Sequence, residues 1–144
     1  MSDTTRNKEL VRRFVDAVNA RNFVALEEIL APDFHRHCPA TPDVEVRSPD
    51  DFRRFIESDA AAVPDSRVTL ETVVGEGDRV AFWATYSGTQ SGQMGPFSPS
   101  NRWASLEFAG VFRIDGDRIA HVAVTWDNVS FLSQLGHMPP MPTP

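Results

Sequence analysis

The chain has 144 residues, of which 41% are hydrophobic and 24% are charged, a balance typical of one globular domain. Its formal net charge of −6 argues against nucleic acid as the main partner. The single cysteine, Cys38, excludes an internal disulfide, and no apolar run approaches the ~20 residues of a membrane span. We therefore expect a cytoplasmic protein without a nucleic-acid or membrane partner, and with room for one core and one pocket.

The first half of the chain has the pattern of three helices. Apolar residues recur at helical spacing over 5–20, and a second helix over 23–30 begins after Asn22, a good N-cap. The third helix, 49–63, begins with proline after Ser48, which is the favoured order at a helix N-terminus. Three helices therefore precede any strand in this interpretation.

After residue 64 the period of the apolar residues changes from about 3.6 to 2, which indicates strands. The predicted strands are 68–74, 79–90, 103–114 and 118–126, and a short helix follows at 129–135. This order predicts an α+β domain with helices on one face of a curved antiparallel sheet of four to six strands. We expect a single domain over 1–136, and a flexible tail over 137–144 because four of these eight residues are proline.

Short motifs along most of the chain resemble those of the SnoaL-like polyketide cyclases, within the fold named after nuclear transport factor two. These motifs are Lys8–Phe14 with Asn19, Leu30–Phe34 with His37, Gly88–Gly92, Phe112–Gly116 with Arg118 and Ile119, and Asp127 with Leu132–Gly136.

The resemblance implies a cone-shaped domain around a deep apolar pocket, a homodimer formed through the outer face of the sheet, and no metal or organic cofactor. The founding cyclase closes a ring by an aldol reaction, with an aspartate and a histidine that would fall at Val124 and Gly110 of this chain. Neither residue can move a proton, so we expect a mechanism that differs from the aldol cyclase.

Asp127 and His37 are the predicted catalytic residues, because both match polar positions of the family. Asp127 has two interpretations, a general base at the edge of the pocket or the N-cap of the last helix. His37 is either a proton carrier in the pocket or a hydrogen-bonded structural histidine. His35, His37 and Cys38 do not predict a metal site, because a closed zinc site needs a fourth ligand.

Trp126 is the strongest substrate-binding candidate, because its ring can pack on an apolar substrate while its indole N–H holds a polar atom. The other predicted substrate-binding residues are Val124, Tyr86, Trp83, Phe14, Phe55, Phe108, Gly110 and Phe131. Trp83 has the opposite strand parity from Tyr86, so either residue could face the pocket. Trp103 and Glu107 are placed on the outer face, where a dimer would form.

The leading functional hypothesis is a cofactor-independent cyclase or isomerase of a hydrophobic, polyketide-like intermediate in secondary metabolism such as antibiotic biosynthesis. Either His37 and Asp127 transfer protons, or the pocket only folds the substrate into a reactive shape. A non-catalytic binding or carrier domain for a hydrophobic molecule is the alternative. Hydrolase or dehydratase chemistry is the second alternative, but the sequence does not indicate the set of convergent carboxylates around an arginine that such relatives use.

Overall fold

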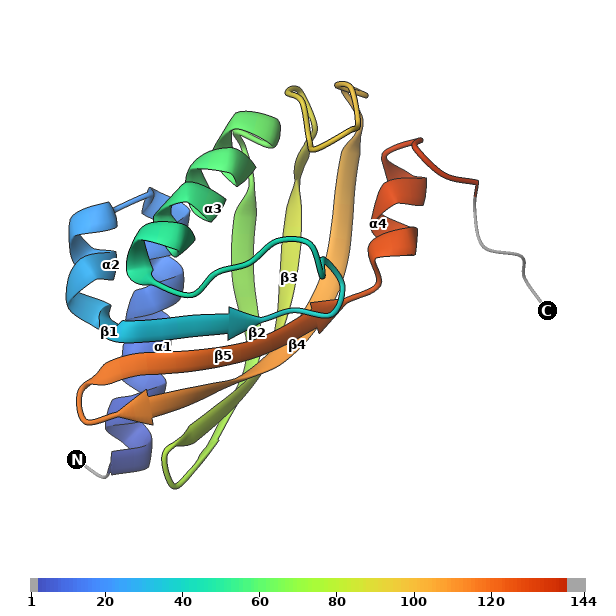
Figure 1. Cartoon of the computed structure of the whole chain (residues 1–144). Coiled ribbons are helices and arrows are strands. Elements are labelled where there is room, and N and C mark those ends of the chain that lie inside the picture. Colours follow the sequence, from blue (N-terminus) through green and yellow to red (C-terminus); the bar gives the residue numbers. More distant parts are fainter. Residues whose placement is uncertain (1–2, 140–144) are drawn as a thin grey trace.

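The structure is a computed structural model that describes residues 3–139 (Figure 1). Its helices are α1 (Asp3–Ala20), α2 (Phe23–Ile29), α3 (Pro49–Ala62) and α4 (Asn128–Gln134). Its strands are β1 (Leu30–His37), β2 (Arg67–Glu76), β3 (Arg79–Thr89), β4 (Trp103–Asp115) and β5 (Arg118–Trp126). The predicted α+β class, the curved open sheet and the short C-terminal helix are confirmed. None of the described helices is long and apolar enough to cross a membrane.

The sheet has the strand order β1-β5-β4-β3-β2 and is antiparallel except at one edge, where β1 runs parallel to β5. Strand β1 follows α2 directly and was missed in the sequence, because residues 30–37 lack a clean apolar alternation. Pro32 also argues against a strand, yet an edge strand tolerates proline because the missing N–H costs no ladder bond on its open side. The predicted antiparallel sheet thus gains a parallel edge strand.

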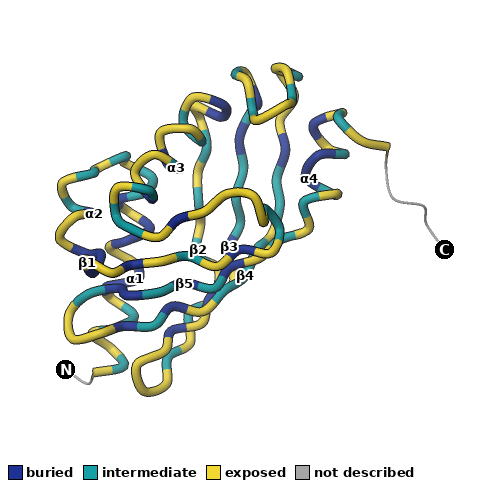
Figure 2. The backbone as a smooth tube through the Cα atoms, in the orientation of Figure 1, coloured by how far each residue is buried: buried dark blue, intermediate teal, exposed yellow. Residues whose placement is uncertain are grey.

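Helices α1, α2 and α3 lie over one face of the sheet, here called the inner face (Figure 1). Burial alternates along β3, where Val80, Phe82 and Ala84 point inward and the residues between them are exposed (Figure 2). Phe14 of α1 packs on Phe112 of β4, with ring centroids 5.3 Å apart. The core therefore fills the space between the helices and the inner face.

Strand β2 has an irregularity between Leu70 and Thr72 that changes which side chains face inward. Val73 pairs with Phe82 and packs against the core, whereas Val74 is exposed on the outer face. A bulge of this kind bends and twists the strand locally, which favours the curvature of the sheet.

The polar side chain of Gln90 organises the end of the molecule near α4. It is fully buried, and its amide nitrogen lies 3.0–3.2 Å from the carbonyl oxygens of Gly92, Phe97 and Ser98. Its amide oxygen bonds to the ring of His137. Contacts with the domain therefore extend beyond residue 136, and residues 140–144 of the predicted tail lie outside the described part of the chain.

Helix α4 ends in a Schellman motif, in which His137 donates its backbone N–H to Leu132 and Gly136 donates to Ser133. Gly136 has a φ of 86°, a left-handed conformation that favours glycine. Phe131 and Leu135 of α4 pack with Ala104 of β4. These contacts hold α4 against the strands at the end of the sheet where β5 stops (Figure 1).

Candidate active site

The deep layer of the inner face is apolar and filled where the resemblance places the acid/base pair of the founding cyclase. Gly110 of β4 lies directly opposite Val124 of β5, and Phe82 of β3 lies opposite Gly110 on its other side. A Cβ atom added at Gly110 would sit 2.9 Å from the Phe82 ring and 2.4 Å from the Ala123 carbonyl oxygen. A residue larger than glycine at position 110 would therefore collide with the Phe82 ring. Position 110 contributes no side chain that could contact a substrate.

Nearer the end of the sheet, seven inward-facing side chains are only half-buried, and we call them the inner patch. They are Arg36, Phe55, Asp59, Tyr86, Leu106, Phe108 and Trp126. They come from α3 and from strands β1, β3, β4 and β5. Half-buried aromatic and charged side chains on the covered face of a sheet are in part open to solvent, which makes them candidates for contact with a ligand.

A tyrosine and an aspartate of the inner patch are joined by a hydrogen bond. Tyr86 of β3 donates its hydroxyl to Asp59 Oδ1 of α3 at 2.7 Å, and Ser66 donates its hydroxyl to Asp59 Oδ2 at 2.9 Å. Arg21 in turn donates to the Ser66 oxygen at 2.9 Å and lies near enough to favour the charged carboxylate. Both oxygens of Asp59 are therefore held in place before a ligand binds.

The surroundings raise the pKa values of both members of this pair. Burial raises the pKa of Asp59 above its ordinary value, although the hydrogen bonds from Tyr86 and Ser66 act in the opposite direction. Burial also raises the pKa of Tyr86, and the neighbouring Asp59 charge raises it further. At neutral pH the phenol stays protonated, while the carboxylate accepts a proton more readily than an exposed aspartate does.

Arg36 supplies a cation to the other side of the inner patch. Its guanidinium carbon lies 4.4 Å from the centre of the Phe55 ring and 5.7 Å from the centre of the Trp126 ring. Phe55 and Asp59 are one turn apart on α3, so the same helix holds the aromatic neighbour of Arg36 and the carboxylate partner of Tyr86.

Asp59 and Arg36 were both missed in the sequence. Asp59 falls four residues after Phe55 and three after Ile56, so a carboxylate on the apolar stripe of a predicted helix was the available signal. Arg36 lies in the strand that was not recognised, and its inward direction had no signal in the sequence.

The two predicted catalytic residues do not meet in the inner patch. Asp127 is exposed and caps α4, where its Oδ1 accepts a hydrogen bond from the Ser130 N–H at 3.0 Å. His37 is exposed and pairs in register with Ala123, on the outer face. A step of four residues along β5 separates the levels of these two side chains, about 13 Å at the usual rise.

The predicted substrate-binding residues divide among four environments, which are the inner patch, the deeper layers, helix α4 and the outer face. Those of the inner patch are Trp126, Tyr86, Phe55 and Phe108, and those of the deeper layers are Phe14, Val124 and Gly110. Phe131 packs edge-on against Tyr86, with ring centroids 5.9 Å apart. Trp83 is 48% exposed on the outer face. Of the two residues, Tyr86 is therefore the one that faces inward. The Trp126 indole N–H already donates to Asn128 Oδ1 at 3.2 Å.

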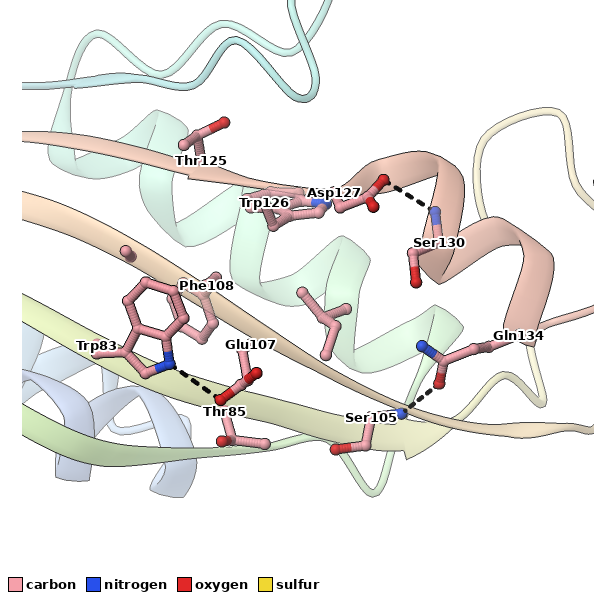
Figure 3. A pocket seen from close by; sticks show the side chains of 12 residues that line it. Trp83, Thr85, Ser105, Glu107, Phe108, Thr125, Trp126, Asp127, Ser130 and Gln134 are labelled. Atoms are coloured by element: carbon pink, nitrogen blue, oxygen red, sulfur yellow. Dashed lines mark hydrogen bonds between the residues drawn. The ribbon is translucent and has the colours of Figure 1, made fainter. Parts of the chain in front are cut away.

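A groove of about 850 Å³ runs over the outer face beside α4 (Figure 3). Trp83 Nε1 donates to Glu107 Oε1 at 3.1 Å in its floor, and Asp127 lies at its α4 side. The groove also reaches Phe108 and Trp126 of the inner patch, where β5 ends. Within residues 3–139 no group of three or more His, Cys, Asp or Glu residues is placed to hold a metal ion.

The raised pKa of Asp59 predicts how its contribution to stability depends on pH. The folded state holds the Asp59 proton more tightly than the unfolded state, so this contribution is complete below the ordinary pKa of 3.8 and is lost as pH rises through the raised value. Asp59→Asn, which cannot ionise, should gain stability relative to the native protein across that window. Urea unfolding of both proteins over a pH series checks this, and a constant stability difference would contradict it.

The hydrogen bond from Ser130 predicts that Asp127 stabilises α4 as a cap. Asp127→Ala should lower the free energy of unfolding by about 1 kcal/mol, whereas Asp127→Asn, which retains the acceptor oxygen, should change it by much less. Urea unfolding at neutral pH measures both variants. Equal losses in the two variants would show that the hydrogen bond is not the source of the effect.

Solved structures with the same fold cover nearly the whole chain. AclR of Streptomyces galilaeus, described as a candidate hydroxylase, is 23% identical with a TM-score of 0.83, over 98% of this chain and 91% of its own. TsrD of Streptomyces laurentii is 28% identical with a TM-score of 0.83, over 96% and 100% of the two chains. IdmH of Streptomyces antibioticus, a candidate polyketide cyclase, is 26% identical with a TM-score of 0.80, over 90% and 98%.

No curated protein matches the sequence. The sequence model described as SnoaL-like polyketide cyclase matches residues 8–135. This match spans all five strands and the four helices apart from the first turn of α1. The chain therefore belongs to the SnoaL-like polyketide cyclase family.

Proposed function

We propose that the protein is a cyclase or isomerase of a hydrophobic, polyketide-like intermediate of secondary metabolism, and that the inner patch binds this substrate. The observation that carries the proposal is the Tyr86–Asp59 hydrogen bond of 2.7 Å on a half-buried aromatic face. The likeness to IdmH, a candidate polyketide cyclase, supports the same reaction class. The acid/base pair differs in position from the one expected at Gly110 and Val124.

The geometry suggests a proton relay through the tyrosine. Tyr86 Oη takes a proton from a carbon beside a substrate carbonyl, while the original Tyr86 proton passes to Asp59 Oδ1. The enolate carbon then forms a bond to an electrophilic carbon of the same molecule. The proton returns by the same route to the anion that results, so the product is an isomer of the substrate. Ser66 and Arg21 hold the Asp59 carboxyl during both transfers.

Two observations favour this function over the alternatives. A carrier domain has no need for a tyrosine and an aspartate joined on its binding face, each with a raised pKa. The hydrolase and dehydratase alternative needs convergent carboxylates, but the inner patch contains a single carboxylate, that of Asp59. Cyclisation or isomerisation, which needs one acid/base pair, therefore fits the inner patch better than either alternative.

Exchange of a carbon-bound proton tests the relay without the natural substrate. 2-Tetralone, a small aromatic ketone, should incorporate deuterium next to its carbonyl faster with the protein than without it. Tyr86→Phe and Asp59→Asn should each lower the protein-dependent rate by about 100-fold or more, because each removes a site of proton transfer. Proton NMR in deuterium oxide measures the rate.

Ser87→Ala is the matched control for this experiment, because Ser87 follows Tyr86 on the same strand and has the outward parity. Its exchange rate should equal that of the native protein. Binding of 2-tetralone without faster exchange would contradict the relay and favour a carrier. Unchanged exchange in both Tyr86→Phe and Asp59→Asn would exclude this pair as the acid/base.

We also propose that two copies associate through the outer face of the sheet. This face exposes large apolar side chains, including Trp103 at 62% and Val111 at 40%. Ala81 and Ala123 pair with Val111 on the neighbouring strands, and Ala109 lies two residues before it on β4, so the centre of the face carries small apolar side chains. A second copy of such a surface would cover it from water.

Charges at the two ends of the outer face favour one orientation of the copies. A row of basic residues crosses four neighbouring strands in register, formed by Arg79, Arg113, His121 and His35. Its two arginines carry the fixed positive charge, because burial and the neighbouring cationic groups lower the pKa of His121. Glu107 and Asp127 lie on the other side of the apolar centre, about six residues or 20 Å along the strands. A two-fold axis that runs across the strands would bring the basic row of each copy opposite the carboxylates of the other.

A charge placed in the apolar centre of the outer face should prevent this association. Val111→Asp should have half the molar mass of the native dimer in solution, because association would bury the new carboxylate in the interface without a partner. Val24→Asp is the matched control, since Val24 is 70% exposed on α2, away from the sheet, and should leave the mass unchanged. Light scattering during size-exclusion chromatography measures both. A native monomer, or dimers of both variants, would contradict the proposal.

A further inference from the structure

Strand β1 turns the Arg36 side chain toward the inner face. Phe34, two residues earlier, is fully buried in the core, while His35 and His37 on either side of Arg36 are exposed. The Arg36 backbone N–H donates to the Val46 carbonyl oxygen at 2.9 Å, and Val46 is buried. The strand and the loop that follows it therefore fix the backbone of Arg36, from which the side chain extends toward the inner face.

Two aromatic rings hold the guanidinium group of Arg36. The ring centre of Phe55 lies 4.4 Å from the guanidinium carbon, and that of Trp126 lies 5.7 Å away. Phe55 packs against Phe52 of the core, and Trp126 is tied by its bond to Asn128. A planar cation beside fixed aromatic rings is stabilised and loses much of its freedom to rotate.

Arg36 has no carboxylate partner among the described residues. The ion pairs of residues 3–139 involve the arginines at positions 6, 12, 47, 53, 54 and 79, but not Arg36. Burial lowers the pKa of Arg36, and the thiol of Cys38 is the polar side chain that interacts with it. Arginine stays protonated in proteins, so the inner patch contains a cation that the protein itself does not neutralise.

The free N–H groups of Arg36 are open to solvent and not sealed in the core. Within residues 3–139, Thr41 Oγ1 is the sole side-chain nitrogen or oxygen that is sealed from solvent and lacks a hydrogen-bond partner. The unbonded guanidinium nitrogens are therefore not enclosed by protein atoms. They remain able to donate a forked pair of hydrogen bonds to a flat, negatively charged group.

We propose that Arg36 anchors an anionic oxygen pair of the ligand, a carboxylate or the enolate of a 1,3-dicarbonyl, attached to an aromatic or conjugated body that packs on Phe55 and Trp126. This inference rests on the proposed function for its site and narrows the substrate to an acidic, planar molecule.

Binding of a matched pair of aromatic probes tests the anchor. 2-Naphthoate carries a carboxylate, and 2-naphthamide has nearly the same shape without the charge. Calorimetry at neutral pH should show that the native protein binds 2-naphthoate about 10- to 100-fold more tightly, because a charged hydrogen bond distinguishes the two probes. This comparison needs no variant.

Arg36→Met keeps an unbranched side chain between the two rings and removes the charge. It should lose the preference for 2-naphthoate while 2-naphthamide binding changes little, and Arg36→Lys should retain part of the preference. Arg53→Met is the matched control, because Arg53 also stacks on an aromatic ring, at 4.5 Å from Phe23, but is exposed and paired with Glu57. That variant should keep the native preference.

Equal affinity of the native protein for the two probes, or an unchanged preference in Arg36→Met, would overturn the anchor. Tyr86→Phe should keep the preference for 2-naphthoate, because this variant alters proton transfer and not the cation. Equal affinity of the native protein for the two probes, together with intact exchange of 2-tetralone, would therefore reject the role of Arg36 alone. A preserved preference without any exchange would reject the acid/base relay alone.

Discussion

The contact between the Phe82 ring and Gly110 decides where this protein can do chemistry. Gly110 has no side chain, and the ring of the residue opposite it on β3 occupies the space that a larger residue would need. Because protein interiors are packed at nearly crystalline density, the ring leaves no room for a side chain at position 110, and Val124 opposite it is apolar. The functional groups of the inner face must therefore lie closer to the end of the sheet.

The position of the inner patch, closer to the end of the sheet than the Phe82 layer, explains its composition. The layer around Phe82 is apolar on β3, β4 and β5, whereas the patch combines aromatic rings with Asp59, Tyr86 and Arg36. A partly buried carboxylate needs hydrogen bonds to be tolerated, and Asp59 has them from Tyr86 and Ser66. The patch thus holds a proton-transferring pair and an unneutralised cation in one aromatic frame, on a fold whose other members need not place their chemistry there.

The two faces of the sheet have different roles in this interpretation. The inner face provides the site, and the outer face provides the surface on which a second copy would pack. Asp127 belongs to the outer face, and it also caps the start of α4. Phe131 of that helix packs against Tyr86. The groove beside α4 reaches both faces at the end of β5, so association through the outer face would alter the surroundings of Trp126.

The sequence by itself determined the three N-terminal helices, the four longer strands and the short last helix, because caps and apolar periods are local signals. Its prediction that Trp126, Tyr86, Phe55 and Phe108 bind the substrate stays a prediction, although all four lie on the inner patch. Only the tertiary structure decided that β1 exists as a parallel edge strand, that Arg36 points inward from it, and that Asp59 meets Tyr86. Such pairings join residues far apart in the chain, and their geometry depends on sheet register and curvature, which no local pattern of residues specifies.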